Sequence, residues 1–421
     1  MGKKKKRHVK KEPIIILVLL IGLIGYFIFN YVVKLINGDP SALKISLNGD
    51  EVITLKYKDG EYTDEGAKAS YKDEDITNNI KVSGKVDYDK VGTYKIKYTV
   101  KYKKIEKEIE REIKIIDEIK PEIELTGGET TFLILGTDYK DKGATAKDNY
   151  DGDITDKIVI DTSDLDKNKI GTYKVHYKVK DSSGNETVAD KIVEVKKKGA
   201  ANQKIAVLNY HFFYENKSEN CNEDICLNMK NFRQQLKYLK DNGYTTLTID
   251  EFVAWMYGEI DVPEKSVLIT IDDGAHGTSK INGNHLIPAL EEYKMHATLF
   301  LITGWWDIKN YKSPYLDVES HTHNLHLGGN CGHRSKVNCI PHDDLLKDLQ
   351  KSIKITKSDA AFCFPFYDYT DESIKVVKEA GFKTAFVGLR RKASRNDDKY
   401  KIPRYPISDN TSLETFKSYV S

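Results

Sequence analysis

The stretch VLITIDDGAHGTS, residues 267–279, places two carboxylates directly after an apolar run. Val267 to Ile271 have the composition of a buried strand, which ends in Asp272, Asp273 and a glycine. Adjacent carboxylates repel each other, so solvent, a metal ion or a shared proton usually offsets the repulsion. Taken alone, these residues favour a solvated turn, because Asp-Gly is a common turn dipeptide.

Around this stretch, from residue 203 to residue 421, short apolar strands alternate with segments of helical periodicity. The expected strands are KIAVLNYH, TTLTI, SVLITID, ATLFLIT, YLDVESHT, AAFCFPF and KTAFVG. The expected helices include MKNFRQQLKYLKDNGY and DESIKVVKEAGF, each of which has a glycine near its end. This alternation predicts a mostly parallel α/β sheet, either open or closed into a barrel.

Polar residues stand where several of these strands end. His211 ends the first expected strand, Asp272 and Asp273 end the third, and His321 ends the fifth. In parallel α/β barrels, catalytic groups gather at the carboxyl ends of the strands. We therefore expect these four side chains to meet at one rim, which a solvated turn would not explain.

The segment ESHTHNLH adds His323 and His326 to His321. One aspartate and two histidines can form an open site for a catalytic Zn²⁺ or a similar divalent ion. We expect Asp273 to bind the cation, while Asp272 stays free as a base. A set of histidines buried in the core is the alternative interpretation.

These motifs resemble the polysaccharide deacetylases, the NodB-homology or carbohydrate esterase family four, whose fold is a distorted (β/α) barrel. TIDDG is similar to the family's first motif, and SHTHNLH is similar to its histidine motif. The usual spacing puts the second histidine four residues after the first, where this chain has Leu325. His326 fits the longer spacing of the biofilm poly-N-acetylglucosamine deacetylase branch, which LNYH and FCFPFYDY also resemble.

The resemblance implies metal-assisted hydrolysis of N-acetyl groups on an N-acetylglucosamine polymer of the cell envelope, either peptidoglycan or poly-N-acetylglucosamine. It implies that Asp272 is the base, that His211 is the general acid, and that the backbone N–H of Phe366 holds the oxyanion. A catalytically inactive carbohydrate-binding or adhesion protein and an O-acetyl polysaccharide esterase are the alternatives. The expected ligands of the divalent metal, for which Zn²⁺ is the expected ion, are Asp273, His321 and His326.

The chain also departs from the family pattern. The family's third motif begins with an arginine that orients the catalytic aspartate, and none lies near Ala360 to Cys363. Arg404 in IPRYPI is the expected substitute, and a surface arginine is the alternative. Trp305 and Trp306 in GWWD could form a platform for a sugar ring or belong to the barrel core.

Five cysteines lie beyond residue 220: Cys221, Cys226, Cys331, Cys339 and Cys363. The first four form two close pairs, which in an exported domain most simply indicate two local disulfides and leave Cys363 free. A zinc knuckle that joins the second pair to His333 and His342 is the alternative, although its spacing matches no common zinc finger.

The N-terminus joins a basic tail, residues 1–12, to an apolar segment without charge from Pro13 to Val33. These 21 residues would span about 31 Å as a helix, and no convincing cleavage site follows. We expect a signal-anchor helix over residues 13–36 that crosses the cell membrane once. The basic flank predicts a cytoplasmic N-terminus and an extracellular remainder, and we do not expect this flank to bind nucleic acid.

Two related copies occupy the middle of the chain. YTDEGAKASYKDEDITNNIKV from Tyr62 parallels YKDKGATAKDNYDGDITDKIVI from Tyr139. Alternation at period two and frequent turn signals predict two small β-sandwiches, residues 41–118 and 119–197. They resemble bacterial Ig-like surface domains, which implies a spacer or adhesion module that contacts the cell wall or another surface protein. The acidic turn DNYDGD could hold calcium, but we interpret its aspartates as solvated.

The sequence thus predicts a multidomain chain. A transmembrane helix is followed by two all-β Ig-like sandwiches and by a C-terminal α/β domain, the distorted (β/α) barrel of residues 203–421.

Overall fold

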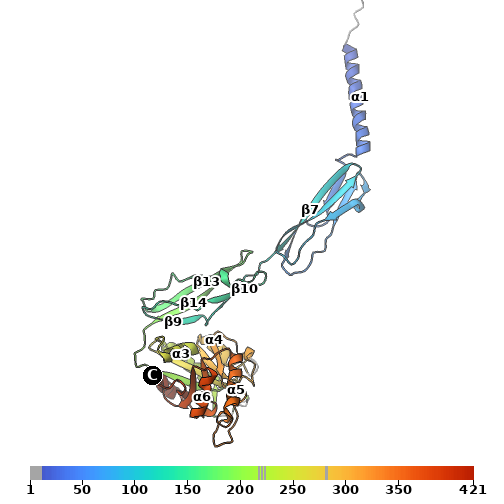
Figure 1. The fold of residues 1–421 in the computed structure, drawn as a ribbon. Helices are drawn as coiled ribbons and strands as arrows, with labels where there is room; N and C mark the ends of the chain where they lie inside the picture. Colours follow the sequence, from blue (N-terminus) through green and yellow to red (C-terminus); the bar gives the residue numbers. More distant parts are fainter. Residues whose placement is uncertain (1–11, 217–218, 220, 222–223, 280–282) are drawn as a thin grey trace, which may run out of the picture. The chain divides into compact units, whose positions relative to one another are not determined.

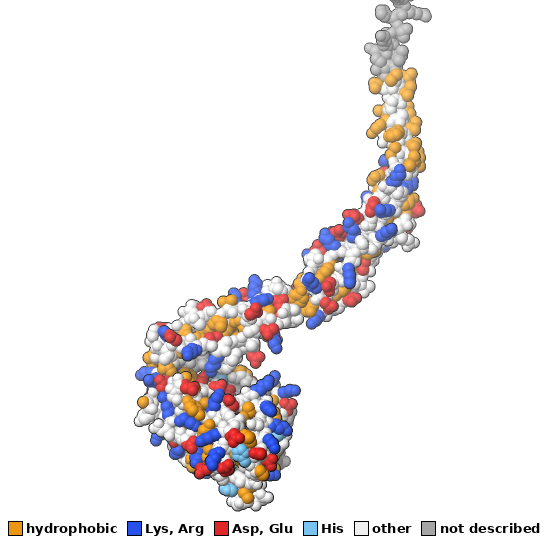
Figure 2. Space-filling view, in the orientation of Figure 1, with side chains coloured by type: hydrophobic (Ala, Val, Ile, Leu, Met, Phe, Trp, Pro, Cys, Tyr) orange, Lys and Arg blue, Asp and Glu red, His pale blue; other side chains and the backbone are white. Residues whose placement is uncertain are grey.

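The computed structural model describes residues 12–216, 219, 221, 224–279 and 283–421 (Figure 1). Nearly all of the predicted basic tail, residues 1–11, lies outside the described residues. The first element is the helix α1, Glu12–Asn37. Its portion Ile16–Asn37 is long and apolar enough to cross a membrane, and Figure 2 shows hydrophobic side chains exposed along it. The predicted helix is confirmed as a helix.

The first Ig-like repeat is a sandwich of two sheets. One sheet has the order β1 (Leu43–Leu47), β3 (Ala67–Tyr71), β4 (Glu74–Asp75). The other has the order β2 (Val52–Lys56), β7 (Ile105–Ile116), β6 (Gly92–Tyr102), β5 (Ile80–Ser83). Alternate residues of these strands face the core, where Leu43 and Val100 are fully buried.

The second repeat has the same strand order. One sheet has the order β8 (Glu122–Leu125), β10 (Ala144–Asp148), β11 (Gly152–Asp153). The other has the order β9 (Thr130–Ile134), β14 (Glu186–Lys196), β13 (Gly171–Lys180), β12 (Val159–Asp161). The chain divides into two compact units, and most of this repeat belongs to the second unit. Its loops 148–152 and 181–185 group with the first. Two Ig-like sandwiches are therefore confirmed.

The C-terminal part is a closed barrel of seven parallel strands. Each strand pairs with the next, and the pairing of the first two in sequence, β15 with β19, closes the ring. The ring order is β15 (Lys204–Tyr210), β19 (Ser266–Asp273), β20 (Ala297–Leu301), β21 (Leu316–Ser320), β22 (Ala361–Cys363), β23 (Thr384–Leu389) and β25 (Ile402–Pro406). The predicted (β/α) barrel is confirmed.

Helices pack around this ring, and several are visible in Figure 1. They are α2 (Met229–Asp241), α3 (Ile249–Tyr257), α4 (Leu286–Tyr293), α5 (His342–Thr356), α6 (Asp371–Ala380) and α7 (Leu413–Val420). Short strands lie outside the ring: β16 (Phe212–Tyr214), β17 (Cys226–Asn228), β18 (Thr245–Thr246) and β24 (Ala393–Ser394). Apolar side chains of the helices, such as Phe232 and Leu290, form one core with the outward faces of the strands.

Two expected strands are much shorter than predicted, and one ring strand was not predicted. AAFCFPF forms a strand only over Ala361–Cys363. TTLTI forms only the short strand β18, because Thr248 caps α3 and the helix begins at Ile249. The seventh ring strand, β25, contains Pro403 and Pro406. Proline lacks the backbone N–H of a sheet ladder, and the ring tolerates it here because β25 pairs through only two residue pairs with each neighbour.

Side chains fill the interior of the barrel. Phe300 and Phe386 meet there with ring centroids 5.2 Å apart, and all eight residues of β19 are buried. Since the interior is packed, reacting groups are accessible only at an end of the ring, as in other parallel barrels.

Candidate active site

The carboxyl ends of the ring strands bring the predicted polar residues together. Asp272 and Asp273 end β19, His211 follows β15, and His321 follows β21. His211 Nε2 lies 3.8 Å from Asp272 Oδ2, and His321 Nε2 lies 3.3 Å from Asp273 Oδ1. β15 pairs with β19, β19 with β20, and β20 with β21. Because these four strands are adjacent in the ring, residues that are distant in sequence meet at their carboxyl ends.

Asp273, His321 and His326 form a group whose potential ligand atoms lie within 4.8 Å of one another. His326 Nε2 lies 3.2 Å from Asp273 Oδ1, close to the corresponding distance for His321. Neither contact is a hydrogen bond, so this buried oxygen has no hydrogen-bond partner among the described residues. A buried carboxylate oxygen that faces two imidazole nitrogens is the donor set that a divalent cation prefers.

Hydrogen bonding and burial prepare the two imidazoles differently. The Nδ1 of His321 lies 2.8 Å from the backbone oxygen of Cys363, which fixes Nδ1 as a donor and turns Nε2 toward Asp273. Burial, reinforced by the nearby His321, lowers the pKa of His326 to about 4, so this ring is neutral at neutral pH.

Despite burial, the neighbouring Cys363 and Asp273 raise the pKa of His321 well above its ordinary value. Burial would raise the pKa of Asp273, but the adjacent His321 lowers it overall. A proton on His321 and a cation at Nε2 are therefore alternative ways to neutralise Asp273, and metal binding would release this proton.

Asp272 forms a buried ion pair with Arg404 of β25. Arg404 Nη1 and Nη2 donate to Asp272 Oδ1 and Oδ2 at 2.7 and 2.9 Å. Burial alone would raise the pKa of Asp272, but Arg404, together with His321 and His211, holds this pKa well below its usual range. Arg404 is fully buried, so the alternative of a surface arginine is wrong. The carboxylate is ionised and held in one orientation.

Cys363, which we expected to lie free beneath the site, and Tyr367, which we did not predict, are neighbours of this pair. The Cys363 thiol lies 3.5 Å from Asp272 Oδ2, and it accepts a hydrogen bond from Arg404 Nη2 at 2.9 Å. Burial raises the pKa of this thiol, which is the free cysteine that we expected. The Tyr367 ring lies over the Arg404 guanidinium, with 5.4 Å between the ring centroid and Cζ.

His211 lies at the edge of the same group. Burial lowers its pKa, and the neighbouring Asp272 and Asp273 counteract only part of this effect. The lowered pKa makes the protonated ring a stronger acid and reduces the fraction of His211 that is protonated at neutral pH.

His323 faces away from the metal-ligand group. Its Nδ1 lies 3.1 Å from Thr303 Oγ1, and its backbone N–H donates to Asp348 at 2.7 Å. The chain turns at Thr322, which has a φ of +75°, so the period-two rule of a strand does not continue to His323. Leu325 packs against the hydrophobic core, and His326 then reaches Asp273.

Aromatic side chains line the group on the solvent side. Trp305 is 48% exposed, and its ring meets the edge of His326 at 5.9 Å between centroids. The Phe366 ring lies 4.7 Å from His326 by the same measure. Trp306 instead packs against the barrel core, so the two tryptophans occupy different environments.

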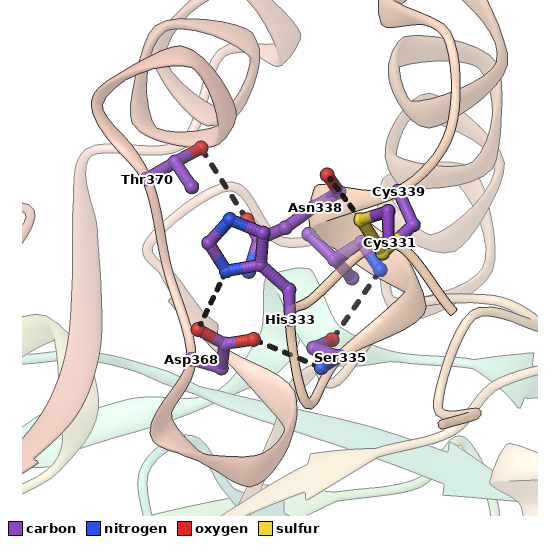
Figure 3. The surroundings of a disulfide bond; sticks show 8 residues. Cys331, His333, Ser335, Asn338, Cys339, Asp368 and Thr370 are labelled. Carbon is purple, nitrogen blue, oxygen red and sulfur yellow. Dashed lines mark hydrogen bonds and ion pairs between the residues drawn. A yellow bond between two sulfur atoms is a disulfide. The ribbon is translucent and has the colours of Figure 1, made fainter. Parts of the chain in front are cut away.

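Two disulfides, Cys221–Cys226 and Cys331–Cys339, stand where the two close pairs predicted them. Figure 3 shows the second, with His333 directed at Asp368 rather than at the sulfurs. Asp368 also accepts a hydrogen bond from the Ser335 N–H at 2.9 Å, which ties the disulfide loop to the segment after Phe366. The zinc-knuckle alternative is therefore wrong.

Two parts of the chain match known protein families. Residues 45–115 and 123–195 match the family described as bacterial surface protein, Ig-like domain. Residues 259–385 match the family described as polysaccharide deacetylase. Both resemblances inferred from the sequence are thus confirmed.

Individual proteins are also similar. The poly-beta-1,6-N-acetyl-D-glucosamine N-deacetylase of Staphylococcus aureus (strain NCTC 8325 / PS 47) is 29% identical over 232 residues, which cover 50% of this chain and 77% of that protein. The protein of the same name from Staphylococcus epidermidis is 28% identical over 204 residues, 44% of this chain and 68% of that one. The solved structure of a Streptococcus pyogenes deacetylase in complex with acetate has a TM-score of 0.46 at 22% identity and covers 52% of this chain and 99% of that chain.

The geometry predicts which histidines hold a metal. His326→Ala should weaken Zn²⁺ binding to the full chain on the order of 100-fold, because it removes one nitrogen of the ligand group. His323→Ala, its matched control, should leave the affinity within about twofold, since this ring contacts Thr303 instead. Competition with a chromophoric chelator measures both. Loss of binding in the His323 variant with retention in the His326 variant would refute the assignment.

Proposed function

Since the C-terminal domain belongs to the polysaccharide deacetylase family and follows two Ig-like domains of bacterial surface proteins, we propose that this chain de-N-acetylates N-acetylglucosamine units of a cell-envelope polysaccharide. The proposed polymer is poly-N-acetylglucosamine or peptidoglycan. One observation carries the proposal: an ionised Asp272, fixed by Arg404, stands beside the group formed by Asp273, His321 and His326. The similarity to the two staphylococcal poly-beta-1,6-N-acetyl-D-glucosamine N-deacetylases supports the choice of substrate.

Asp273, His321 and His326 would hold a divalent cation, for which we propose Zn²⁺. The buried Asp273 oxygen without a hydrogen-bond partner and the mixture of imidazole and carboxylate support this choice. Such an ion polarises a carbonyl group and makes water more acidic.

Asp272 would take a proton from the attacking water. Its pKa lies well below the usual range, so the carboxylate is available as an acceptor at any physiological pH. Arg404 keeps both oxygens in place by its two parallel hydrogen bonds. Arg404 is thus a positioning residue, which takes the role of the arginine that is missing near Ala360.

His211 would give its proton to the departing amine nitrogen as the bond between carbon and nitrogen breaks. The products are acetate and the free amine of the sugar. Protonation is needed because an unprotonated amide nitrogen is a poor leaving group. The Phe366 N–H would donate to the developing oxyanion. The exposed ring of Trp305 supports a role as a platform for the sugar, whereas the packing of Trp306 in the core argues against one.

The division of labour between the two aspartates can be tested directly. Asp272→Asn should retain bound Zn²⁺ and lose turnover, by on the order of 100-fold or more, because an amide cannot accept the proton of water. Asp273→Asn should lose the metal, because it replaces one of the three ligands. Metal content and acetate release are measured on the same preparations. Equal loss of metal from both variants would contradict this division.

The substrate proposal is tested on three polymers side by side: poly-N-acetylglucosamine, peptidoglycan and acetylxylan. The Zn²⁺-loaded full chain should release acetate from at least one of the two N-acetylated polymers, and the Asp272→Asn variant should not. Release from acetylxylan alone would favour the esterase alternative. No release from any polymer by the metal-loaded chain would favour an inactive binding protein.

We further propose that α1 anchors the protein in the cell membrane, with the N-terminus cytoplasmic and the remainder extracellular. The apolar span Ile16–Asn37 and the two disulfides support this topology. The Ig-like repeats would then hold the barrel away from the membrane and contact the cell wall or another surface protein. Deletion of residues 1–37 should move the protein from the membrane fraction to the soluble fraction, and retention in the membrane would contradict the anchor.

A further inference from the structure

A second group of carboxylates belongs to the first compact unit rather than to the barrel. Asp117 follows β7, Asp148 ends β10, and Asp181 follows β13. One oxygen of each lies within 4.8 Å of the others. All three aspartates belong to the first compact unit, and Asp117 and Asp181 are only 7% and 6% exposed.

The hydrogen bonds that these carboxylates accept leave two oxygens without a partner. Asp181 accepts hydrogen bonds from the N–H groups of Gly184 and Asn185. Asp148 accepts them from the N–H groups of Tyr150 and Asp151. The Oδ2 atoms of Asp117 and Asp148 are buried and have no hydrogen-bond partner in the described part of the chain.

The described part of the chain supplies no ion-pair partner that would compensate the negative charge of this group. Among the residues that the structure describes, no lysine or arginine forms an ion pair with Asp117, Asp148 or Asp181. Gathering three carboxylates away from water is unfavourable unless a cation or a proton balances them. The unpartnered Oδ2 of Asp117, on a side chain more than nine-tenths buried, is the clearest sign that a ligand belongs here.

The first repeat provides an internal comparison. β3 ends at Tyr71 as β10 ends at Asp148. Tyr102 ends β6, ten residues after Gly92 begins it, and Asp181 follows β13, ten residues after Gly171 begins it. Tyr102 and Asp181 are therefore equivalent positions of the two repeats. Tyr71 and Tyr102 stack, with ring centroids 4.3 Å apart. In the first repeat, two stacked tyrosine rings therefore occupy the positions at which the second repeat has carboxylates.

We propose that Asp117, Asp148 and Asp181 bind Ca²⁺. The donors are all oxygen atoms, which suit Ca²⁺, and no histidine or cysteine belongs to this group to favour Zn²⁺. Asn149 and Asn185 donate their amide groups to the aspartates, and rotation of either amide would turn an oxygen ligand inward. The ion would join the end of β7 to two loops of the second repeat. Asp148 of DNYDGD is therefore a ligand rather than a solvated turn residue.

Isothermal titration of the chelator-treated full chain in detergent tests this site. We expect one saturable Ca²⁺ site with a Kd between about 10⁻⁶ and 10⁻³ M. Asp117→Asn and Asp181→Asn should each weaken binding at least about tenfold. Asp153→Asn, the matched control in the same acidic turn, should not, because its carboxylate accepts from the Thr155 N–H and does not belong to the group of three aspartates. Asp273→Asn should also leave this site intact, which separates it from the active site.

Hydrogen exchange of the wild-type chain tests the same site without a variant. Ca²⁺ should slow exchange in residues 148–152 and 181–185, which contain the two loops. Absence of saturable binding up to about 10 mM Ca²⁺ would overturn the proposal. So would unchanged affinity in both the Asp117 and Asp181 variants, or protection by Ca²⁺ confined to other segments.

Discussion

The active site depends on one buried ion pair, that of Asp272 with Arg404. Removing one partner from such a pair leaves an uncompensated buried charge and typically costs about 3–5 kcal/mol. The arginine comes from β25 and the aspartate from β19, and β15 lies between these two strands in the ring. Arg404 can therefore hold the carboxylate in this orientation only when β25 has paired beside β15. The pairing of β15 with β19 brings His211 at the end of β15 to within 3.8 Å of Asp272.

The sequence predicted those features that depend on neighbours along the chain. TIDDG, the apolar strands and the close cysteine pairs are local patterns, and the barrel and both disulfides follow from them. The contacts of Arg404 could not be predicted from local patterns, because its partner Asp272 is distant in sequence. Only the absence of the family's arginine near Ala360 suggested that Arg404 pairs with Asp272. The contact of Cys363 with Asp272 had no sequence signal, since a lone buried cysteine looks the same beside a carboxylate or beside a leucine. Pro403 and Pro406 concealed β25 because the usual rule excludes proline from inner strands.

The histidine motif marks the boundary between what periodicity can and cannot predict. Residues 321 and 323 would share a face on a strand, but Thr322 adopts a left-handed conformation and ends that relation. His326 then approaches from a loop whose position depends on Leu325 in the core and on the disulfide that follows. Likewise, the sequence pattern does not distinguish Trp305 from Trp306, and only packing separates the exposed ring of Trp305 from the partly buried ring of Trp306.

The position of β25 in the chain has a consequence for biosynthesis. A chain anchored by α1 and exported from its N-terminus would present the Ig-like repeats first, and β15 and β19 would emerge before either has Arg404 within reach. Until β25 arrives, Asp272 lacks its arginine, and the first and last strands of the ring each lack a neighbour. A chain that stopped before residue 402 would lack Arg404 and would carry an open barrel with an uncompensated carboxylate. The site can therefore assemble only after nearly the whole chain has been made.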